Sequence, residues 1–183
     1  EVISEDEFVE VITPLELYDK LYDNLQAEMT SSCNKIYKKE LFDNLRFKNG
    51  IINEDDEILH YIVDKINNIS YINVAYYNYY QRGNSIMHKP NPKAKQSVEN
   101  LIIRGNYFLR KKMIKYYEMN SYLICYLLAK FYKSLDNNYY NQNIKKYSKI
   151  VLSSKYCNFK KKLIVFLIRI HHKMFDLLMS LGK

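Results

Sequence analysis

The sequence predicts an α+β protein with a mixed first half and a helical second half. Residues 1–92 combine β-prone stretches with helix-like ones, whereas residues 93–183 contain no proline and only two glycines. Apolar residues of the second half recur at spacings of three and four, which is typical of amphipathic helices. With 48% hydrophobic residues in 183, the chain can bury a core. We therefore expect two parts, 1–92 and 93–183.

Local patterns predict the individual elements. Pro14 stands at a position tolerated in a first helical turn, and Leu15, Tyr18 and Leu21 follow at helical spacing. The aromatic and β-branched stretch that ends at Arg82 favours extended backbone. In the first half we expect a strand over 2–12, helices over 14–25, 33–45 and 55–67, and a strand or hairpin over 69–82. In the second half we expect helices over about 93–118, 121–135, 139–153 and 159–181.

The charge is unevenly placed. The net charge is +8, and residues 144–183 carry nine Lys, one Arg and one Asp, a balance of +9. The remaining residues are therefore near −1, and the basicity belongs to the C-terminal part. Three separated cysteines without a CxxC pair indicate reduced thiols, and the four histidines show no zinc-ligand spacing with them.

Four consecutive acids, Glu54, Asp55, Asp56 and Glu57, begin one of the expected helices. Acids in a first turn interact favourably with the positive end of the helix dipole, by about 0.3–1 kcal/mol each. Asn53 can act as the N-cap, with Asp56 three residues later. Capping alone explains two acids, but four adjacent carboxylates repel one another. This indicates a further role for some of them.

The segments "CNKIYKKELF", "NEDDE" and "YYNYYQRGNSIM" follow one another between residues 33 and 88. In order and spacing they resemble the C-terminal half of bacterial family-2 glycosyltransferases of GT-A fold, the group that builds capsular and other surface polysaccharides. The resemblance implies that residues 1–92 are the acceptor-side part of a Rossmann-like α/β catalytic domain. Residues 93–183 are then a helical appendage. It also implies inverting transfer of a sugar from a nucleotide sugar to a saccharide or lipid-linked acceptor.

The resemblance places a general base in the Glu54–Asp55 pair. Asp55 is the expected base, and Asp56 is its rival because the sequence offers two consecutive aspartates. Such a carboxylate removes the proton of the attacking hydroxyl, which contributes about 10²–10⁴-fold to the rate. Asn34 and Lys35 match an acceptor-side pair of the family, although Cys33 stands where the family usually has Trp.

The same resemblance assigns a substrate-binding loop. Arg82 could bind the diphosphate of the donor, because a guanidinium matches phosphate oxygens bidentately, or could be a solvated charge at a strand end. Ser85 resembles a serine of that loop, and Gln81 is a further candidate. His88 could approach a divalent metal or a phosphate, or could simply be exposed.

The family holds Mg²⁺ or Mn²⁺ with a DxD motif, because clustered oxygens suit hard cations. This sequence contains no DxD, no glycine-rich phosphate loop and no opening βαβ pattern, and it does not begin with Met. We therefore expect a fragment without the donor-binding half, inactive and without a metal when alone.

Residues 159–181 combine a Lys triplet with an apolar helical pattern that is too short to span a bilayer. One interpretation is a basic amphipathic helix on the anionic inner face of the plasma membrane, which implies a cytoplasmic, peripheral protein. The other is a helix packed on Leu123, Leu127 and Phe131. The alternative functions are a basic, Tyr-rich nucleic-acid-binding module, which no motif supports, and a helical protein-interaction module.

Overall fold

A computed structural model describes residues 9–23, 25–72, 74, 76–78, 80 and 93–170. The chain divides into two compact units. The first contains the described residues up to Asn49 and those from Glu54 to Tyr80. The second contains Gly50–Asn53 and the described residues from Lys93 onward.

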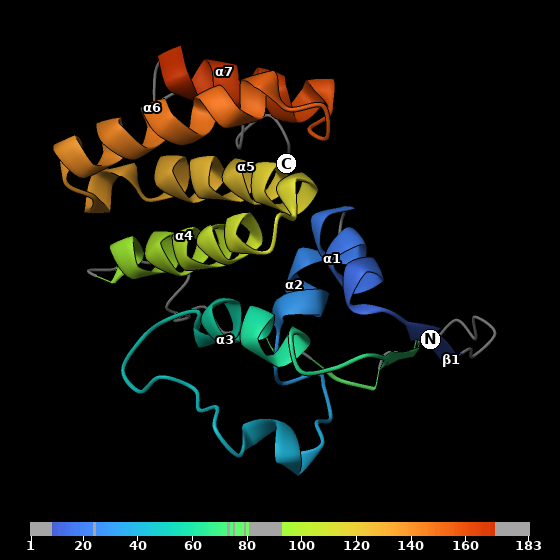
Figure 1. Cartoon of the computed structure of the whole chain (residues 1–183). Coiled ribbons are helices and arrows are strands. Elements are labelled where there is room, and N and C mark those ends of the chain that lie inside the picture. The colour runs from blue at the N-terminus through green and yellow to red at the C-terminus, as the bar shows by residue number, and fades with distance from the viewer. Residues whose placement is uncertain are drawn as a thin grey trace. The chain divides into compact units, whose positions relative to one another are not determined.

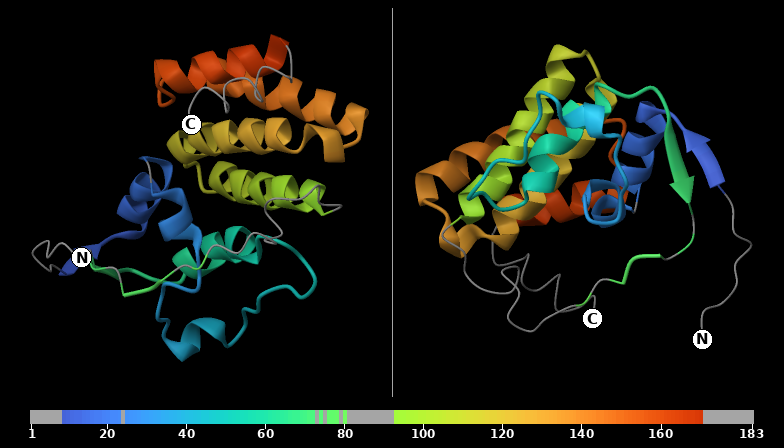
Figure 2. Two further views of the ribbon diagram at one scale, coloured as in Figure 1. Left: turned by 180° about the vertical axis from the view of Figure 1, so that it is seen from behind. Right: turned by 90° about the horizontal axis from the view of Figure 1, so that it is seen from below.

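The first unit combines helices with a two-stranded antiparallel sheet, as the right-hand view of Figure 2 shows. In the sheet, Val9 lies opposite Ile72 and Ile12 opposite Ile69. Helix α1 packs against α2, and α2 contacts α3. Most apolar side chains at helical spacing in α1 and α3 are buried, as predicted, but Leu15 of α1 is exposed. The elements of this unit are β1 (Val9–Ile12), α1 (Pro14–Asp23), α2 (Gln26–Thr30), η1 (Lys39–Phe42), α3 (Glu54–Val63) and β2 (Ile69–Ile72).

Two expected elements of this unit are shorter in the structure. Of the strand or hairpin predicted over 69–82, the structure has strand β2 at Ile69–Ile72, and the described residues 74, 76–78 and 80 form no strand. The remaining residues of that range lie outside the described residues. The helix predicted over 33–45 is reduced to one 3₁₀ turn, η1, which buries no side chain. Ile36, just before it, is fully exposed. A short helix without a buried face lacks the packing that stabilises it.

The second unit is a stack of four helices, α4 to α7, in sequence order (Figure 1). Each helix contacts the next, and α7 also contacts α5. Its core includes Leu101, Ile124, Leu128 and Val151, all fully buried. The helices are α4 (Ala94–Arg110), α5 (Ile114–Lys130), α6 (Asn137–Ser153) and α7 (Phe159–Ile170), with a 3₁₀ turn, η3, at Tyr132–Ser134.

The break between α4 and α5 lies at residues 111–113, whereas the sequence predicts it near residue 119. Lys112 has a φ of 57°, which places it in the left-handed region. The Met113 amide donates to the carbonyl of Phe108 (2.8 Å), and the Lys112 amide donates to that of Leu109 (3.0 Å). This is a Schellman end, which glycine usually provides. Because a lysine occupies the position, the sequence contains no visible stop signal.

Polar side chains connect α4 and α5 inside the second unit. Arg104 and Asn120 are both fully buried. The Arg104 Nε donates to the Asn120 Oδ1 (3.1 Å), and the Asn120 Nδ2 donates to the carbonyl of Leu101 (2.8 Å). A Cβ at Gly105 would lie 3.1 Å from the Asn120 Nδ2. The absence of a side chain at Gly105 therefore allows the two helices to approach closely there.

None of the described helices is long and apolar enough to cross a membrane.

Candidate functional site

The four-acid run forms the first turn of α3, where sequence analysis places it. Asn53, immediately before the helix, has a φ of 53°. This left-handed backbone differs from the extended conformation typical of an N-cap, although Asn tolerates it. The unpaired N–H groups of the first turn interact favourably with negative charge. The helix start therefore suits acidic side chains.

The acids differ in burial. Asp56 and Glu57 are buried, with 8% and 3% of their surface exposed, whereas Glu54 and Asp55 are partly exposed. Glu57 forms an ion pair with the exposed Lys48, and this hydrogen bond raises the pKa of the Lys48 ammonium. Glu57 therefore has a structural role. Glu54 and Asp55 remain as the acids of the run that are open to a substrate.

A turn after α2 holds the Asn34–Lys35 pair. The Lys35 ammonium donates to the carbonyl of Glu28 (2.6 Å), to that of Ser31 and to the Asn34 Oδ1 (2.8 Å). The Asn34 amide also donates to the Glu28 carbonyl (3.0 Å). These carbonyls lie at the C-terminal end of α2, whose orphan acceptors such donors satisfy. The pair therefore has a fixed position in the first unit.

Asp55 acts electrostatically on this turn. Burial lowers the pKa of the Lys35 ammonium to about 8, and the negative charges of Asp55, Cys33 and Glu28 oppose that shift. Burial also raises the pKa of the Tyr37 hydroxyl, and the negative charge of Asp55 raises it further. The charge of the expected base thus acts on Lys35, although the two residues are twenty positions apart in sequence.

Two further side chains of this cluster were not anticipated as functional. The Cys33 thiol lies 3.0 Å from the Ser31 hydroxyl. Hydrogen bonds from Ser31 and Tyr77 lower the pKa of the Cys33 thiol, whereas the negative charge of Asp55 raises it. Tyr77 is half exposed. The sequence contains 19 Tyr, which a composition bias explains, so no signal singled out Tyr37 or Tyr77.

We define the acceptor cluster as Cys33, Asn34, Lys35, Tyr37, Asp55 and Tyr77. It offers a carboxylate, an ammonium of lowered pKa and hydroxyl groups within one unit. These groups can accept a proton from a polyhydroxylated ligand and donate hydrogen bonds to it. The arrangement suits a sugar hydroxyl better than an apolar ligand.

The other predicted site residues, Gln81, Arg82, Ser85 and His88, lie outside the described residues. Within residues 9–80 and 93–170, as far as the structure describes them, no three His, Cys, Asp or Glu side chains form a group that could hold a metal.

The chain matches no known protein family, no curated protein and no solved structure.

Proposed function

We propose that this chain is the acceptor-side portion of an inverting glycosyltransferase, the function that its motifs resemble. The donor is a nucleotide sugar, and the acceptor is a saccharide or a lipid-linked saccharide. The first unit is the C-terminal part of a GT-A catalytic domain, and the second unit is its helical appendage. Asp55 is the general base.

The observation that carries this proposal is the electrostatic interaction of the Asp55 charge with Lys35. The acid pair and the Asn34–Lys35 pair are separate motifs of the resemblance, and each was assigned to the acceptor side. In the structure the Asp55 charge acts on Lys35, Tyr37 and Cys33. A helix cap without further function has no need of such neighbours.

The proposed reaction needs one proton acceptor in the acceptor cluster. The acceptor hydroxyl gives its proton to an Asp55 carboxylate oxygen as its own oxygen attacks the anomeric carbon. The bond between that carbon and the nucleoside diphosphate breaks, and its electron pair leaves with the diphosphate oxygen. Attack opposite the leaving group inverts the anomeric configuration. Proton removal of this kind is worth about 10²–10⁴-fold in rate.

Burial distinguishes Asp55 from its rivals. Asp56 is buried, and Glu57 is bound to Lys48, so neither is as open to an acceptor as Asp55. Glu54 is partly exposed, but the side chains of the turn after α2 respond to the charge of Asp55. The three N–H groups of the Lys35 ammonium already donate to the carbonyls of Glu28 and Ser31 and to the Asn34 Oδ1, so its contribution is the electrostatic interaction with Asp55.

Gln81, Arg82 and Ser85 complete the proposal on the donor side. A guanidinium and a hydroxyl can bind the diphosphate as its charge develops. Mg²⁺ or Mn²⁺ would neutralise the same diphosphate, and the described residues provide no cluster of acids for it. His88 remains a candidate ligand near the phosphates. The proton transfer itself depends only on side chains of this chain.

The test compares Asp55→Asn with Asp56→Asn and Glu54→Gln in the protein that carries this chain in its native gene. Sugar transfer to the acceptor is measured at saturating donor. We expect Asp55→Asn to lower turnover by about a hundredfold or more with unchanged donor KM, because a base acts in the transition state. Asp56→Asn and Glu54→Gln should each cost about tenfold or less. A large loss in Asp56→Asn alone would move the base by one residue, and three active variants would refute the assignment.

A further inference from the structure

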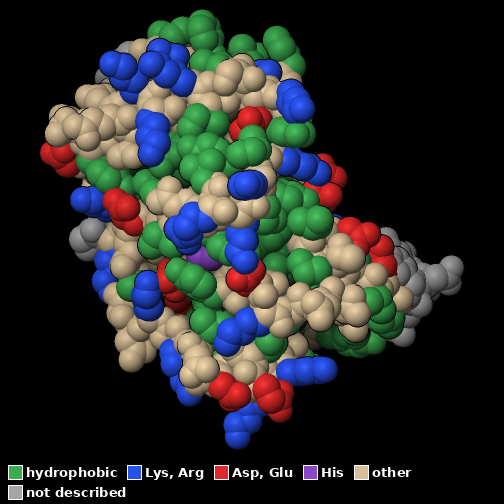
Figure 3. All heavy atoms as spheres, in the orientation of Figure 1, with side chains coloured by type: hydrophobic (Ala, Val, Ile, Leu, Met, Phe, Trp, Pro, Cys, Tyr) green, Lys and Arg blue, Asp and Glu red, His purple; other side chains and the backbone are tan. Residues whose placement is uncertain are grey.

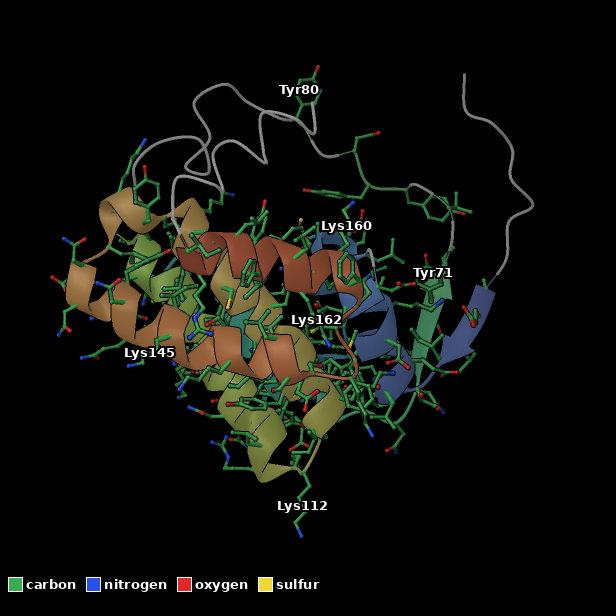
Figure 4. The ribbon with its side chains drawn as sticks, turned by 90° about the horizontal axis from the view of Figure 1, so that it is seen from above. Tyr71, Tyr80, Lys112, Lys145, Lys160 and Lys162 are labelled. Atoms are coloured by element: carbon green, nitrogen blue, oxygen red, sulfur yellow. The ribbon has the colours of Figure 1, made fainter. Side chains whose placement is uncertain are left out.

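Helix α7 uses one face to complete the core of the second unit. Val165 and Ile168 are fully buried, and Ile164 packs against the same cluster as Leu123, Leu127 and Phe131. The packing interpretation of this helix is therefore confirmed for that face. Figure 4 looks onto α7 from above and labels Lys160 and Lys162 near its beginning.

The opposite face of α7 carries a second apolar stripe, which is exposed. Phe159, Leu163, Phe166 and Ile170 follow at spacings of four, three and four, so they line one side of the helix. Their exposed fractions are 80%, 44%, 49% and 64%. Single exposed apolar residues are ordinary, but a contiguous stripe marks an interaction surface. Figure 3 shows hydrophobic side chains beside Lys and Arg at this end of the second unit.

The stripe belongs to a segment without any negative side chain. Residues 137–170, which form α6 and α7, contain seven Lys, one Arg and no Asp or Glu, a net charge of +8. Lys145 on α6 and Lys160 on α7 are exposed and are both labelled in Figure 4. An apolar stripe edged by cations is the pattern of a helix that lies in a membrane interface.

We propose that the exposed face of α7 is a docking surface for an anionic lipid bilayer. The stripe of Phe159, Leu163, Phe166 and Ile170 would enter the boundary between headgroups and acyl chains, roughly 5–10 Å deep. Lys155, Lys160 and Arg169, all exposed, would meet the anionic headgroups. This surface lies in the second unit, so the inference does not depend on the proposed chemistry of the acceptor cluster.

Charge and side-chain type favour lipid over the other occupants of such a face. A second copy of the chain would place +8 against +8, which disfavours a symmetric contact. Single-stranded nucleic acid stacks its bases on aromatic rings. Two of the four stripe residues, Leu163 and Ile170, are aliphatic and offer no ring for stacking. Acyl chains and anionic headgroups match both parts of the face.

The test is sedimentation of the full chain with vesicles. One preparation contains equal parts of phosphatidylglycerol and phosphatidylcholine, and the other contains phosphatidylcholine alone. We expect binding to the anionic vesicles that is at least about tenfold tighter than to the neutral ones and that weakens as salt is raised. Equal binding to both vesicles, or binding to neither, would overturn the proposal.

Matched variants locate the surface. The triple variant Lys155→Glu, Lys160→Glu, Arg169→Glu should weaken binding to the anionic vesicles by about a hundredfold or more, because each surface cation is worth about fivefold. Its control reverses the exposed charges at the α4–α5 turn, where Figure 4 labels Lys112. That control, Arg110→Glu, Lys111→Glu, Lys112→Glu, makes the same change in net charge and should bind within about threefold of the parent. Equal losses in both triples would overturn the assignment to α7.

The apolar stripe has its own pair of variants. Leu163→Gln with Phe166→Gln should weaken vesicle binding by about tenfold or more, whereas Leu109→Gln with Ile114→Gln should not. All four side chains are at least 40% exposed, so the fold tolerates the changes. If the chain binds a single-stranded RNA but not vesicles, and the α7 triple variant abolishes the RNA binding, the face is assigned to nucleic acid instead. If sedimentation equilibrium shows a dimer and the variant Leu163→Gln with Phe166→Gln dissociates it, the exposed face of α7 is assigned to self-association.

Discussion

Asn120→Ala should be among the most destabilising single substitutions in the second unit. The side chain is fully buried and connects α5 with α4 through two hydrogen bonds, one from the charged Arg104 and one to Leu101. Alanine removes both and keeps the helix. Arg104, itself fully buried, then loses an acceptor in a place that water does not reach.

The magnitude follows from these contacts. A hydrogen bond to a charged group contributes about 1.5–3 kcal/mol, and a neutral one about 0.5–1.5 kcal/mol. The helix propensity of alanine returns about 0.5 kcal/mol. We expect Asn120→Ala to lower the free energy of unfolding by about 1.5–4 kcal/mol. The double variant Arg104→Met, Asn120→Leu should recover part of that loss, because it removes the buried charge together with its partner.

Denaturation in urea, followed by far-UV circular dichroism, measures this loss. Asn143→Ala is the matched control, since the Asn143 amide donates to the carbonyl of Tyr139 within α6 (2.9 Å) and is only half buried. It should cost less than about 1 kcal/mol. A loss below about 1 kcal/mol for Asn120→Ala, or equal losses for the two variants, would refute the buried connection between α4 and α5.

Two further predictions concern the first unit. Lys48→Met should lower the free energy of unfolding by about 1–2 kcal/mol, because it leaves the buried Glu57 carboxylate without its partner. Glu57→Gln should lower it by less than about 1 kcal/mol, because the Lys48 ammonium that it leaves unpaired is exposed. Urea denaturation of both variants measures the difference. Lys35 should titrate near pH 8 in lysine NMR, against an ordinary value of 10.5, and lower still in Asp55→Asn. Between about pH 8 and 10.5 the folded chain has released the Lys35 proton and the unfolded chain still holds it, so the free energy of unfolding should rise with pH over this range. Lys35→Met should lack this rise. The same pH profile in Lys35→Met as in the parent would contradict the burial of Lys35.

Periodicity predicted the helices whose apolar faces are buried. Tyr18 and Leu21 lie at the expected spacing and are buried, whereas Leu15, predicted with them, is exposed. The sequence could not predict the end of α4, because Lys112 adopts a backbone conformation that glycine usually marks. Local pattern therefore predicted most of the helices, but it missed α2 and predicted a helix over 33–45 where the structure has only the 3₁₀ turn η1.

Much less of the candidate site was visible in the sequence. The acid run at a helix start follows from capping rules, and its role as a base follows only from the resemblance. That Glu57 pairs with Lys48, whereas the Asp55 charge acts on the turn after α2, depends on how α2 and α3 pack. Tyr77 belongs to the acceptor cluster through its hydrogen bond with Cys33, a tertiary contact that no local sequence pattern predicts.

Chemical rescue tests the central claim, that Asp55 takes the proton of the acceptor. In the protein that carries this chain, Asp55→Ala removes the carboxylate, and added formate can take its place as an external base. We predict that formate raises the rate of sugar transfer by Asp55→Ala at least about tenfold and leaves Asp56→Ala and the parent unchanged. If formate fails to raise the rate of Asp55→Ala, or raises both variants equally, Asp55 is not the base.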